Sequence, residues 1–239
     1  MDLIDLFVGS EGTLGVIVNA TLRVNPLPRS GVLAMVPVPD ETAGLKLVHE
    51  LRDESRRTWS RRDPNGIDVA AIEHLDRRCL DLLREDQIDR TQHVAVPDDT
   101  ALLLIVQLEL TTGVTAGDAY EQIAGALTSD ADSSLARFCR LLSSYGVLDR
   151  SEVAMPGDVK RAQQFLGLRE GAPTAVNRRV GEAKRLADTR IEKTAADMIV
   201  PFDRFADMMV MYREGFASRG LDYAIWGHIS DGNVHPNVI

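Results

Sequence analysis

The sequence predicts an α+β fold in which helices pack on one face of an antiparallel sheet. Apolar runs of strand length alternate with segments of helical periodicity, and the loops between them are compatible with antiparallel pairing. The longest apolar run, residues 101–110, is expected to be a central strand buried along much of its length. With 239 residues, of which 44% are hydrophobic, the chain can form one large core or two smaller ones.

The remaining elements are expected in a regular order along the chain. Alternation predicts a strand over residues 16–24, and the prolines and glycine of residues 25–31 predict a domain junction. Further strands are expected at 32–36, 66–73 and 221–226, and helices at 40–57, 74–84, 116–127 and 202–219. Residues 129–134 are expected to form a polar loop, and residues 191–201 a loop that enters a short strand. Residues 156–185 are helical in character, with an interruption expected at Gly171-Ala172-Pro173 because proline cannot donate a helical hydrogen bond.

Charge and cysteine content exclude several classes of protein. A net charge of −9 and a pI near 5.1 argue against a general nucleic-acid binder and against binding to anionic membranes. Cys79 and Cys139 lack a CxxC spacing, so we expect two core cysteines in a reducing, cytoplasmic setting. Residues 1–7 lack the basic region and long apolar run of a signal peptide, and no apolar stretch approaches the roughly 18 residues that span a bilayer, so we expect a soluble protein.

A glycine-rich loop lies near the start of the chain. Gly9, Gly12 and Gly15 are spaced by three and would allow the backbone to approach another group closely. The loop is followed by an expected strand, so it matches neither the dinucleotide fingerprint nor the Walker loop, both of which continue into a helix. From spacing alone, a plain turn and a cofactor contact both remain open.

Two histidines lie close to the end of the chain. The strand at 221–226 leads into His228, and an Asp231-Gly232 turn leads on to His235, so both imidazoles can point to one place. Neutral imidazole is a common ligand of divalent cations such as zinc, but either ring could instead cap a turn. Arg169, next to the expected helix break, could present its guanidinium to a carboxylate or be an ordinary surface arginine.

Two motifs at opposite ends of the chain resemble one family. Asp5-Leu6-Phe7-Val8-Gly9-Ser10-Glu11-Gly12-Thr13-Leu14-Gly15-Val16-Ile17 resembles the motif that ends the flavin domain of FAD-linked oxidases of the vanillyl-alcohol oxidase and p-cresol methylhydroxylase type. Gly227-His228-Ile229-Ser230-Asp231-Gly232-Asn233-Val234-His235-Pro236-Asn237 resembles the Gly-His-x-x-Asp-Gly-Asn-x-His-x-Asn motif of the same superfamily. The branch is that of D-lactate and D-2-hydroxyglutarate dehydrogenases and the flavin subunit of glycolate oxidase.

The resemblance implies a FAD-dependent oxidoreductase that acts on the CH–OH group of a small 2-hydroxy acid such as D-lactate, glycolate or D-2-hydroxyglutarate. His228 and His235 would be ligands of a divalent metal, usually zinc, which polarises the substrate hydroxyl. Arg169 would bind the substrate carboxylate, and Asn237 would bind substrate. Lys193 is the candidate for the family's substrate lysine, although it stands four residues before Asp197 and the family's lysine about two. The residues implied to lie along FAD are Ser10, Glu11, Gly12, Thr13, Gly15, Val16, Ile17 and Asn233.

The chain also departs from the family pattern. The resemblance makes residues 1–30 the end of a FAD-binding domain and residues 31–239 a ferredoxin-like C-terminal or cap domain. In the family, the pyrophosphate loop precedes the first motif, and a Ser-x-Glu-His-Gly element beyond the second supplies the metal carboxylate and the catalytic histidine. We therefore expect a fragment with no catalytic residue of its own, which binds FAD weakly or not at all and does not turn over.

The expected partners are a small 2-hydroxy acid, an electron acceptor or companion subunit, and a second copy of the chain in a homodimer. The alternative function is a non-catalytic module, derived from the cap domain, that binds a ligand or another subunit. A two-histidine zinc hydrolase is disfavoured, because the sequence has no HExxH motif and no nucleophile elbow.

Overall fold

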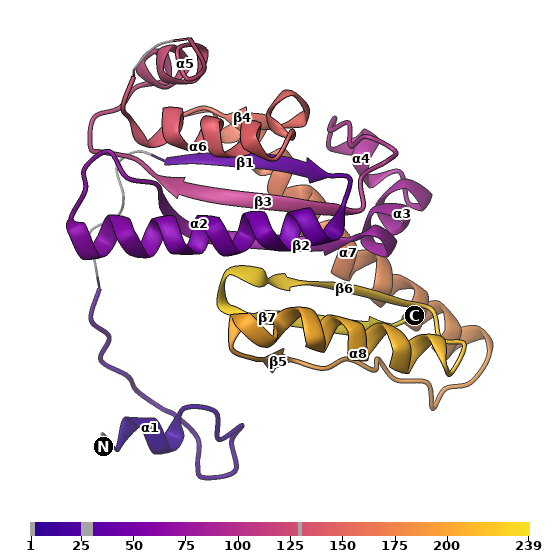
Figure 1. Ribbon diagram of the computed structural model, residues 1–239. Helices are drawn as coiled ribbons and strands as arrows, with labels where there is room; N and C mark the ends of the chain where they lie inside the picture. Colours follow the sequence, from indigo (N-terminus) through magenta and orange to yellow (C-terminus); the bar gives the residue numbers. More distant parts are fainter. Residues whose placement is uncertain (1–2, 25–30, 129–130) are drawn as a thin grey trace.

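The computed structural model describes residues 3–24, 31–128 and 131–239. Seven strands form one sheet in the order β4-β1-β3-β2-β6-β7-β5, and neighbouring strands pair antiparallel (Figure 1). The strands are β1 Gly31–Val38, β2 Asp68–Asp76, β3 Leu102–Glu109, β4 Glu152–Ala154, β5 Met198–Ile199, β6 Tyr223–His228 and β7 Asn233–Val238. Strand β3 pairs along its whole length with both β1 and β2, which confirms the predicted central strand.

The helices connect these strands and begin at side-chain caps where the sequence supplies them. They are α1 Ile4–Phe7, α2 Glu41–Arg61, α3 Arg77–Glu85, α4 Ile88–Thr91, α5 Ala116–Ala124, α6 Ser134–Ser144, α7 Val159–Leu186 and α8 Phe205–Ala217, with 3-10 turns η1 Leu148–Arg150, η2 Phe202–Arg204 and η3 Ile229–Asp231. Asp40 accepts a hydrogen bond from the backbone N–H of Ala43, as expected for the cap of α2. No described helix is long and apolar enough to cross a membrane.

Separate hydrophobic cores lie on the two faces of the sheet. On β1, Val32, Ala34, Val36 and Val38 face a core covered by α2, α6 and α8, while Leu33 and Met35 face a core covered by α3 and α7 (Figure 1). The predicted α+β class and antiparallel sheet with helices are confirmed. The sequence led us to expect helices on one face, but they cover two, because the central strands are apolar on both sides.

Helix α7 is continuous where a break was expected. Pro173 lies inside it and cannot donate to the carbonyl of Arg169, yet the helix runs on to Leu186. Small residues explain the tolerance, because they let α7 approach α3 closely: a Cβ on Gly171 would lie only 2.6 Å from Leu83 Cδ2. Burial of this face of α7 offsets the lost hydrogen bond, and the predicted interruption is wrong.

One helix boundary also differs from the prediction. His74, expected to begin a helix, belongs to β2, because that strand continues to Asp76. Asp76 then caps α3 by accepting a hydrogen bond from the backbone N–H of Cys79. Of the polar loop, residues 129–130 lie outside the described residues, and Ser133 caps α6.

The N-terminal arm (residues 3–24) runs away from the body (residues 31–239) (Figure 1). No strand forms over residues 16–24, where one was predicted, and Val16, Val18 and Leu22 are 88%, 93% and 78% exposed. An alternating segment becomes a strand only when a neighbouring strand satisfies its backbone groups, and no described part of the chain does so. Residues 25–30 of the expected domain junction lie outside the described residues.

Candidate functional site

The hairpin of β6 and β7 brings the two motif histidines together. Trp226 lies opposite His235 in the β6–β7 register, and η3 with Gly232 forms the turn. The ring centroids of His228 and His235 are 6.3 Å apart and the rings stand at 85° to one another. The structure therefore places the two imidazoles side by side, on the face of the sheet that α3 and α7 cover.

The turn between these histidines requires a glycine. Gly232 has a φ of +78°, and a Cβ at this position would lie 2.3 Å from the carbonyl oxygen of Val200. The left-handed backbone and the close approach of the chain before η2 both disfavour any larger residue. The hairpin geometry is thus fixed by local backbone chemistry as well as by strand pairing.

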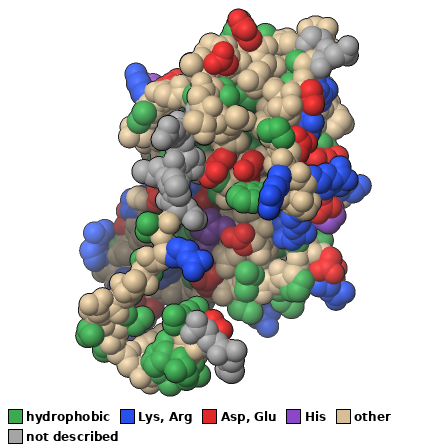
Figure 2. Space-filling view, turned by 90° about the vertical axis from the view of Figure 1, so that its left-hand side faces the viewer, with side chains coloured by type: hydrophobic (Ala, Val, Ile, Leu, Met, Phe, Trp, Pro, Cys, Tyr) green, Lys and Arg blue, Asp and Glu red, His purple; other side chains and the backbone are tan. Residues whose placement is uncertain are grey.

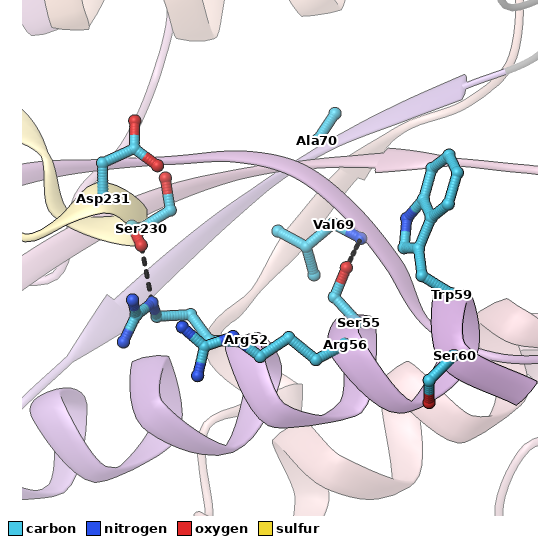
Figure 3. Close-up of a pocket in the computed structure, with 9 residues that line it drawn as sticks. All are labelled: Arg52, Ser55, Arg56, Trp59, Ser60, Val69, Ala70, Ser230 and Asp231. Atoms are coloured by element: carbon cyan, nitrogen blue, oxygen red, sulfur yellow. Dashed lines mark hydrogen bonds between the residues drawn. The ribbon is translucent and has the colours of Figure 1, made fainter. Parts of the chain in front are cut away.

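Arg52 on α2 holds the same turn from the opposite face of the sheet. Its Nε donates to the carbonyl oxygen of Ser230 at 2.5 Å (Figure 3). Its guanidinium lies 4.1 Å from the ring centroid of Phe202. The backbone N–H of Ile72 donates to Ser230 Oγ at 3.4 Å. A cavity of about 760 Å³ opens beside this contact, between α2, β2 and η3, and Arg56 and Trp59 line it (Figure 3). We regard Arg52 as a support for the turn that carries the histidines.

Glu73 on β2 is the nearest carboxylate to His228. The two residues face one another in the β2–β6 register, and Glu73 Oε1 lies 2.9 Å from His228 Nδ1. The Glu73 side chain is 14% exposed and that of His228 is 44% exposed. A half-buried carboxylate thus stands behind one nitrogen of an imidazole whose other side is open.

Arg169 on α7 joins this group from above the sheet. Its Nε lies 3.3 Å from Glu73 Oε2, and its Nη1 donates to Glu170 Oε1 at 2.5 Å. Burial opposes the guanidinium charge, but the neighbouring carboxylates outweigh it, so the pKa of Arg169 is raised. The predicted carboxylate-binding arginine is therefore beside the histidines, but it already has two carboxylate neighbours.

His235 has a more exposed carboxylate neighbour. Asp197, just before β5, places Oδ1 at 3.3 Å from His235 Nδ1, and its side chain is 73% exposed. The same Oδ1 accepts a hydrogen bond from Asn233 Nδ2 at 2.7 Å. Asn233 thus lies next to the histidine pair and is tied to its edge.

Asn237 lies further along the same hairpin, and Lys193 reaches the hairpin from the loop between α7 and β5. Asn237 is 1% exposed, donates from Nδ2 to the carbonyl oxygen of His235, and leaves its Oδ1 without a hydrogen-bond partner among the described residues. Lys193 Nζ lies 5.7 Å from the ring centroid of Trp226 and makes no ion pair within the described chain. The structure therefore brings Arg169, Lys193 and Asn237 to the hairpin that carries the two histidines.

The donor set near the hairpin suits a metal only in part. Within the described residues, no three His, Cys, Asp or Glu side chains gather as a metal site. Each imidazole has its Nδ1 against a carboxylate, the arrangement typical of metal-binding histidines, so Nε2 of each ring remains for a ligand. The residues present fit two of the donors that a zinc ion requires.

A third histidine, His74, shows a different environment one residue from Glu73. It is 1% exposed on the α2 face of the sheet, and neither ring nitrogen has a hydrogen-bond partner in the described chain. Burial, with a further contribution from the charge of Arg213, lowers the pKa of His74 to about 3. His74 is therefore a neutral core residue, and strand alternation alone separates it from the site.

The predicted flavin loop does not contribute to this cluster. Residues 10–17 lie in the N-terminal arm, whose apolar side chains are exposed apart from the body (Figure 2). Within the described chain they form a loop held by local contacts, such as the hydrogen bond from the Thr13 hydroxyl to the carbonyl oxygen of Ser10.

The class of this protein follows from the family that its sequence matches. The sequence matches the family described as "FAD linked oxidases, C-terminal domain" over residues 27–239, and the chain belongs to this family.

The relatives are named for oxidation of hydroxy acids. The chain is 26% identical over 238 residues to the mitochondrial D-2-hydroxyglutarate dehydrogenase of Rattus norvegicus, covering 99% of this chain and 36% of the relative. It is 27% identical to the D-2-hydroxyglutarate dehydrogenase of Pantoea ananatis, covering 98% and 20%, and 24% identical to glycolate oxidase subunit GlcD of Bacillus subtilis, covering 98% and 40%. The chain thus spans between a fifth and two fifths of the length of these relatives.

Sequence reasoning missed Glu73 as a site residue. It was included only as the last residue of an expected strand, and its role depends on which face of the sheet it occupies. A usable signal was present, because a carboxylate two residues from buried Leu75 on an alternating strand points to the same core. Its partners His228 and Arg169 are so distant in sequence that no local pattern joins them to it.

Proposed function

We propose that this chain forms the substrate and metal side of a FAD-dependent oxidoreductase that acts on the CH–OH group of a small 2-hydroxy acid such as D-lactate, glycolate or D-2-hydroxyglutarate. The observation that carries the proposal is the cluster of His228, His235 and Arg169 on one face of the sheet. Membership of the FAD-linked oxidase family and the names of the relatives support the same chemistry.

In this proposal the two histidines hold a divalent metal, zinc in the first instance, through Nε2. A bound zinc ion would act as a Lewis acid that lowers the pKa of the substrate hydroxyl. Arg169 would exchange one of its carboxylate neighbours for the substrate carboxylate, since it already lies beside His228 with its charge maintained. Lys193 and Asn237 would bind the remaining polar groups of the acid.

FAD would supply the hydride acceptor. We assign residues 1–30 to the end of a FAD-binding domain and residues 31–239 to the substrate domain. Ser10, Glu11, Gly12, Thr13, Gly15, Val16 and Ile17 would then lie along the flavin, and Asn233 would face it from the hairpin. The exposure of the arm supports this assignment, because its apolar side chains have no cover within the described chain.

The setting in the cell is part of the proposal. Cys79 and Cys139 are free and buried, which suits a reducing compartment, and we propose the cytoplasm. An electron acceptor or companion subunit would complete the reaction, and a homodimer is its simplest assembly.

Calorimetric titration tests this function on the purified chain. Zinc followed by D-2-hydroxyglutarate or D-lactate is expected to bind the unmodified protein, and acid binding should be lost in His228→Ala and in Arg169→Ala. His49→Ala and Arg57→Ala change exposed residues on α2, which covers the opposite face of the sheet, and should bind normally. Absence of both metal and acid binding in the unmodified chain would contradict the proposal and favour a non-catalytic module that binds another subunit.

Flavin binding gives a second readout. After equilibration with FAD and gel filtration, the chain should emerge without a stoichiometric oxidised-flavin spectrum. Recovery of the protein with one bound flavin per chain would contradict the assignment of residues 1–30 as only the end of a flavin domain.

A further inference from the structure

We propose that Glu73 is a positioning residue that sets the tautomer and orientation of His228 and holds the guanidinium of Arg169 beside it. The inference rests on the proposed function for its purpose, but its geometry belongs to the described chain alone. Neither motif that identified the family contains Glu73, which lies on a different strand from both histidines.

The backbone fixes the position of Glu73 relative to His228. The two residues are register partners on neighbouring strands, so their side chains leave the same face of the sheet side by side. Glu73 Oε1 lies 2.9 Å from His228 Nδ1, which is within hydrogen-bond distance. In the adjacent register pair, His74 and Gly227, the side chain of His74 points to the opposite face of the sheet. A shift of the β2–β6 register by one residue would therefore separate Glu73 from His228.

This contact selects one form of the neutral imidazole. A neutral histidine carries one N–H, and a carboxylate accepts hydrogen bonds but donates none. With the proton on Nδ1, His228 donates to Glu73 and presents the lone pair of Nε2 to the open side. With the proton on Nε2, the Nδ1 lone pair would face a half-buried carboxylate oxygen at 2.9 Å, which is repulsive. Glu73 therefore keeps His228 in its ligand form before any ligand arrives.

The second oxygen of Glu73 links His228 to Arg169. Oε2 lies 3.3 Å from Arg169 Nε and makes no aligned hydrogen bond within the described chain. Arg169 also uses Nη1 for Glu170, while its Nη2 makes no hydrogen bond to any described residue. One half-buried carboxylate thus positions a ligand nitrogen and a cation that can still turn toward an incoming acid.

His235 provides an internal comparison. Its carboxylate neighbour, Asp197, is 3.3 Å away and 73% exposed, whereas Glu73 is 2.9 Å from His228 and 14% exposed. An exposed contact at longer range is weaker, because water competes for both groups. Tautomer control should therefore be strong at His228 and weak at His235.

Nitrogen-15 NMR of the imidazole side chains in the metal-free full chain tests the proposal directly. In its neutral form, His228 is expected as the Nδ1–H tautomer. Glu73→Gln should make it a mixture of tautomers, because the amide can donate as well as accept. Glu170→Gln, which removes the other partner of Arg169 without touching His228, is the matched control and should leave the tautomer unchanged.

Zinc affinity provides the functional readout. Glu73→Gln is expected to weaken zinc binding about 10–100-fold, the usual cost of removing a carboxylate behind a metal-binding histidine. Asp197→Asn should weaken it less. A normal affinity in Glu73→Gln would contradict the positioning role in ligand binding.

The NMR result also distinguishes this proposal from the proposed function. An Nε2–H tautomer of His228 in the unmodified protein would overturn the proposal, even if Glu73→Gln fails to fold. An Nδ1–H tautomer with no zinc or hydroxy-acid binding would instead contradict the function and leave the orientation by Glu73 intact.

Discussion

The two motif-bearing regions of the chain differ in how much structure they acquire. Residues 227–237 form a hairpin inside the seven-stranded sheet, with His228 backed by Glu73 and the turn held by Arg52. Residues 5–17 carry an equally specific motif, yet they lie in an exposed arm with no strand partner in the described chain. A motif identifies a family from its residues alone, but it becomes a site only where neighbouring elements fix its side chains.

The largest expected difference between the two regions is in stability. Leu104→Ala, at a fully buried position of the central strand, should lower the free energy of unfolding by about 2–5 kcal/mol because it leaves a cavity. Leu22→Ala removes the same atoms from a side chain that is 78% exposed. It should change the free energy of unfolding by less than about 0.5 kcal/mol. Urea denaturation followed by circular dichroism measures both. Equal destabilisation would mean that the arm packs on the body.

Two glycines with the same backbone conformation make a sharper comparison. Gly232 in the hairpin has φ +78° and Gly12 in the arm has φ +79°, but only Gly232 faces a close neighbour, the carbonyl of Val200. Gly232→Ala should destabilise the body by at least about 1–2 kcal/mol from the left-handed backbone alone. Gly12→Ala should leave the thermal midpoint of the body unchanged. A normal midpoint for Gly232→Ala would show that the turn relaxes easily.

The loss of stability at low pH should come from His74, the histidine that lies outside the candidate site. Its pKa is lowered to about 3. The contribution of neutral His74 to the free energy of unfolding is therefore fully present above about pH 6.5 and is lost as pH falls toward 3. Burial raises the pKa of Asp76 to about 6, so its contribution is present below about pH 4 and is lost as pH rises through 6. The two contributions oppose one another between about pH 4 and 6.

Replacing the histidine separates these contributions. The variant His74→Leu lacks the contribution that rises with pH. The difference in unfolding free energy, His74→Leu minus unmodified protein, should therefore fall by up to about 1.4 kcal/mol per pH unit as pH rises from about 4 to 6. Urea titrations at several pH values measure this slope. Parallel curves for the two proteins would show that His74 is not buried in its neutral form.

The smallest effect is expected from removing the arm. Deletion of residues 1–24 should leave the unfolding free energy of the body within about 0.5 kcal/mol, since the arm buries almost no side chain against it. Differential scanning calorimetry of both chains tests this. A fall of several degrees in the midpoint would mean that the arm contributes packing in solution.

Local patterns were enough to predict most of the fold and part of the site. Alternation and apolar runs found the central strand, Asp40 marked the start of α2, and His-x6-His around a glycine turn brought two imidazoles together. Each of these features depends on residues close in the sequence. They are therefore visible without any knowledge of long-range contacts.

The errors came where tertiary contacts decide the outcome. Pro173 predicts a break, but the packing of Gly171 against Leu83 keeps α7 helical. The alternation of residues 16–24 predicts a strand that has no partner in the described chain. Glu73 was missed because its role is created by His228, which is far away in the sequence and next to it in the sheet. The metal, substrate and flavin contacts stay predictions.

Zinc titration of the arm-deleted chain is the most direct test of the central claim, which is that the hairpin of the body carries the metal ligands without the arm. Calorimetry should give one zinc ion per chain for both the full and the arm-deleted protein. Binding should be lost in His228→Ala and His235→Ala and kept in His49→Ala. Zinc binding that survives both hairpin substitutions, or that disappears with the arm, would contradict the account.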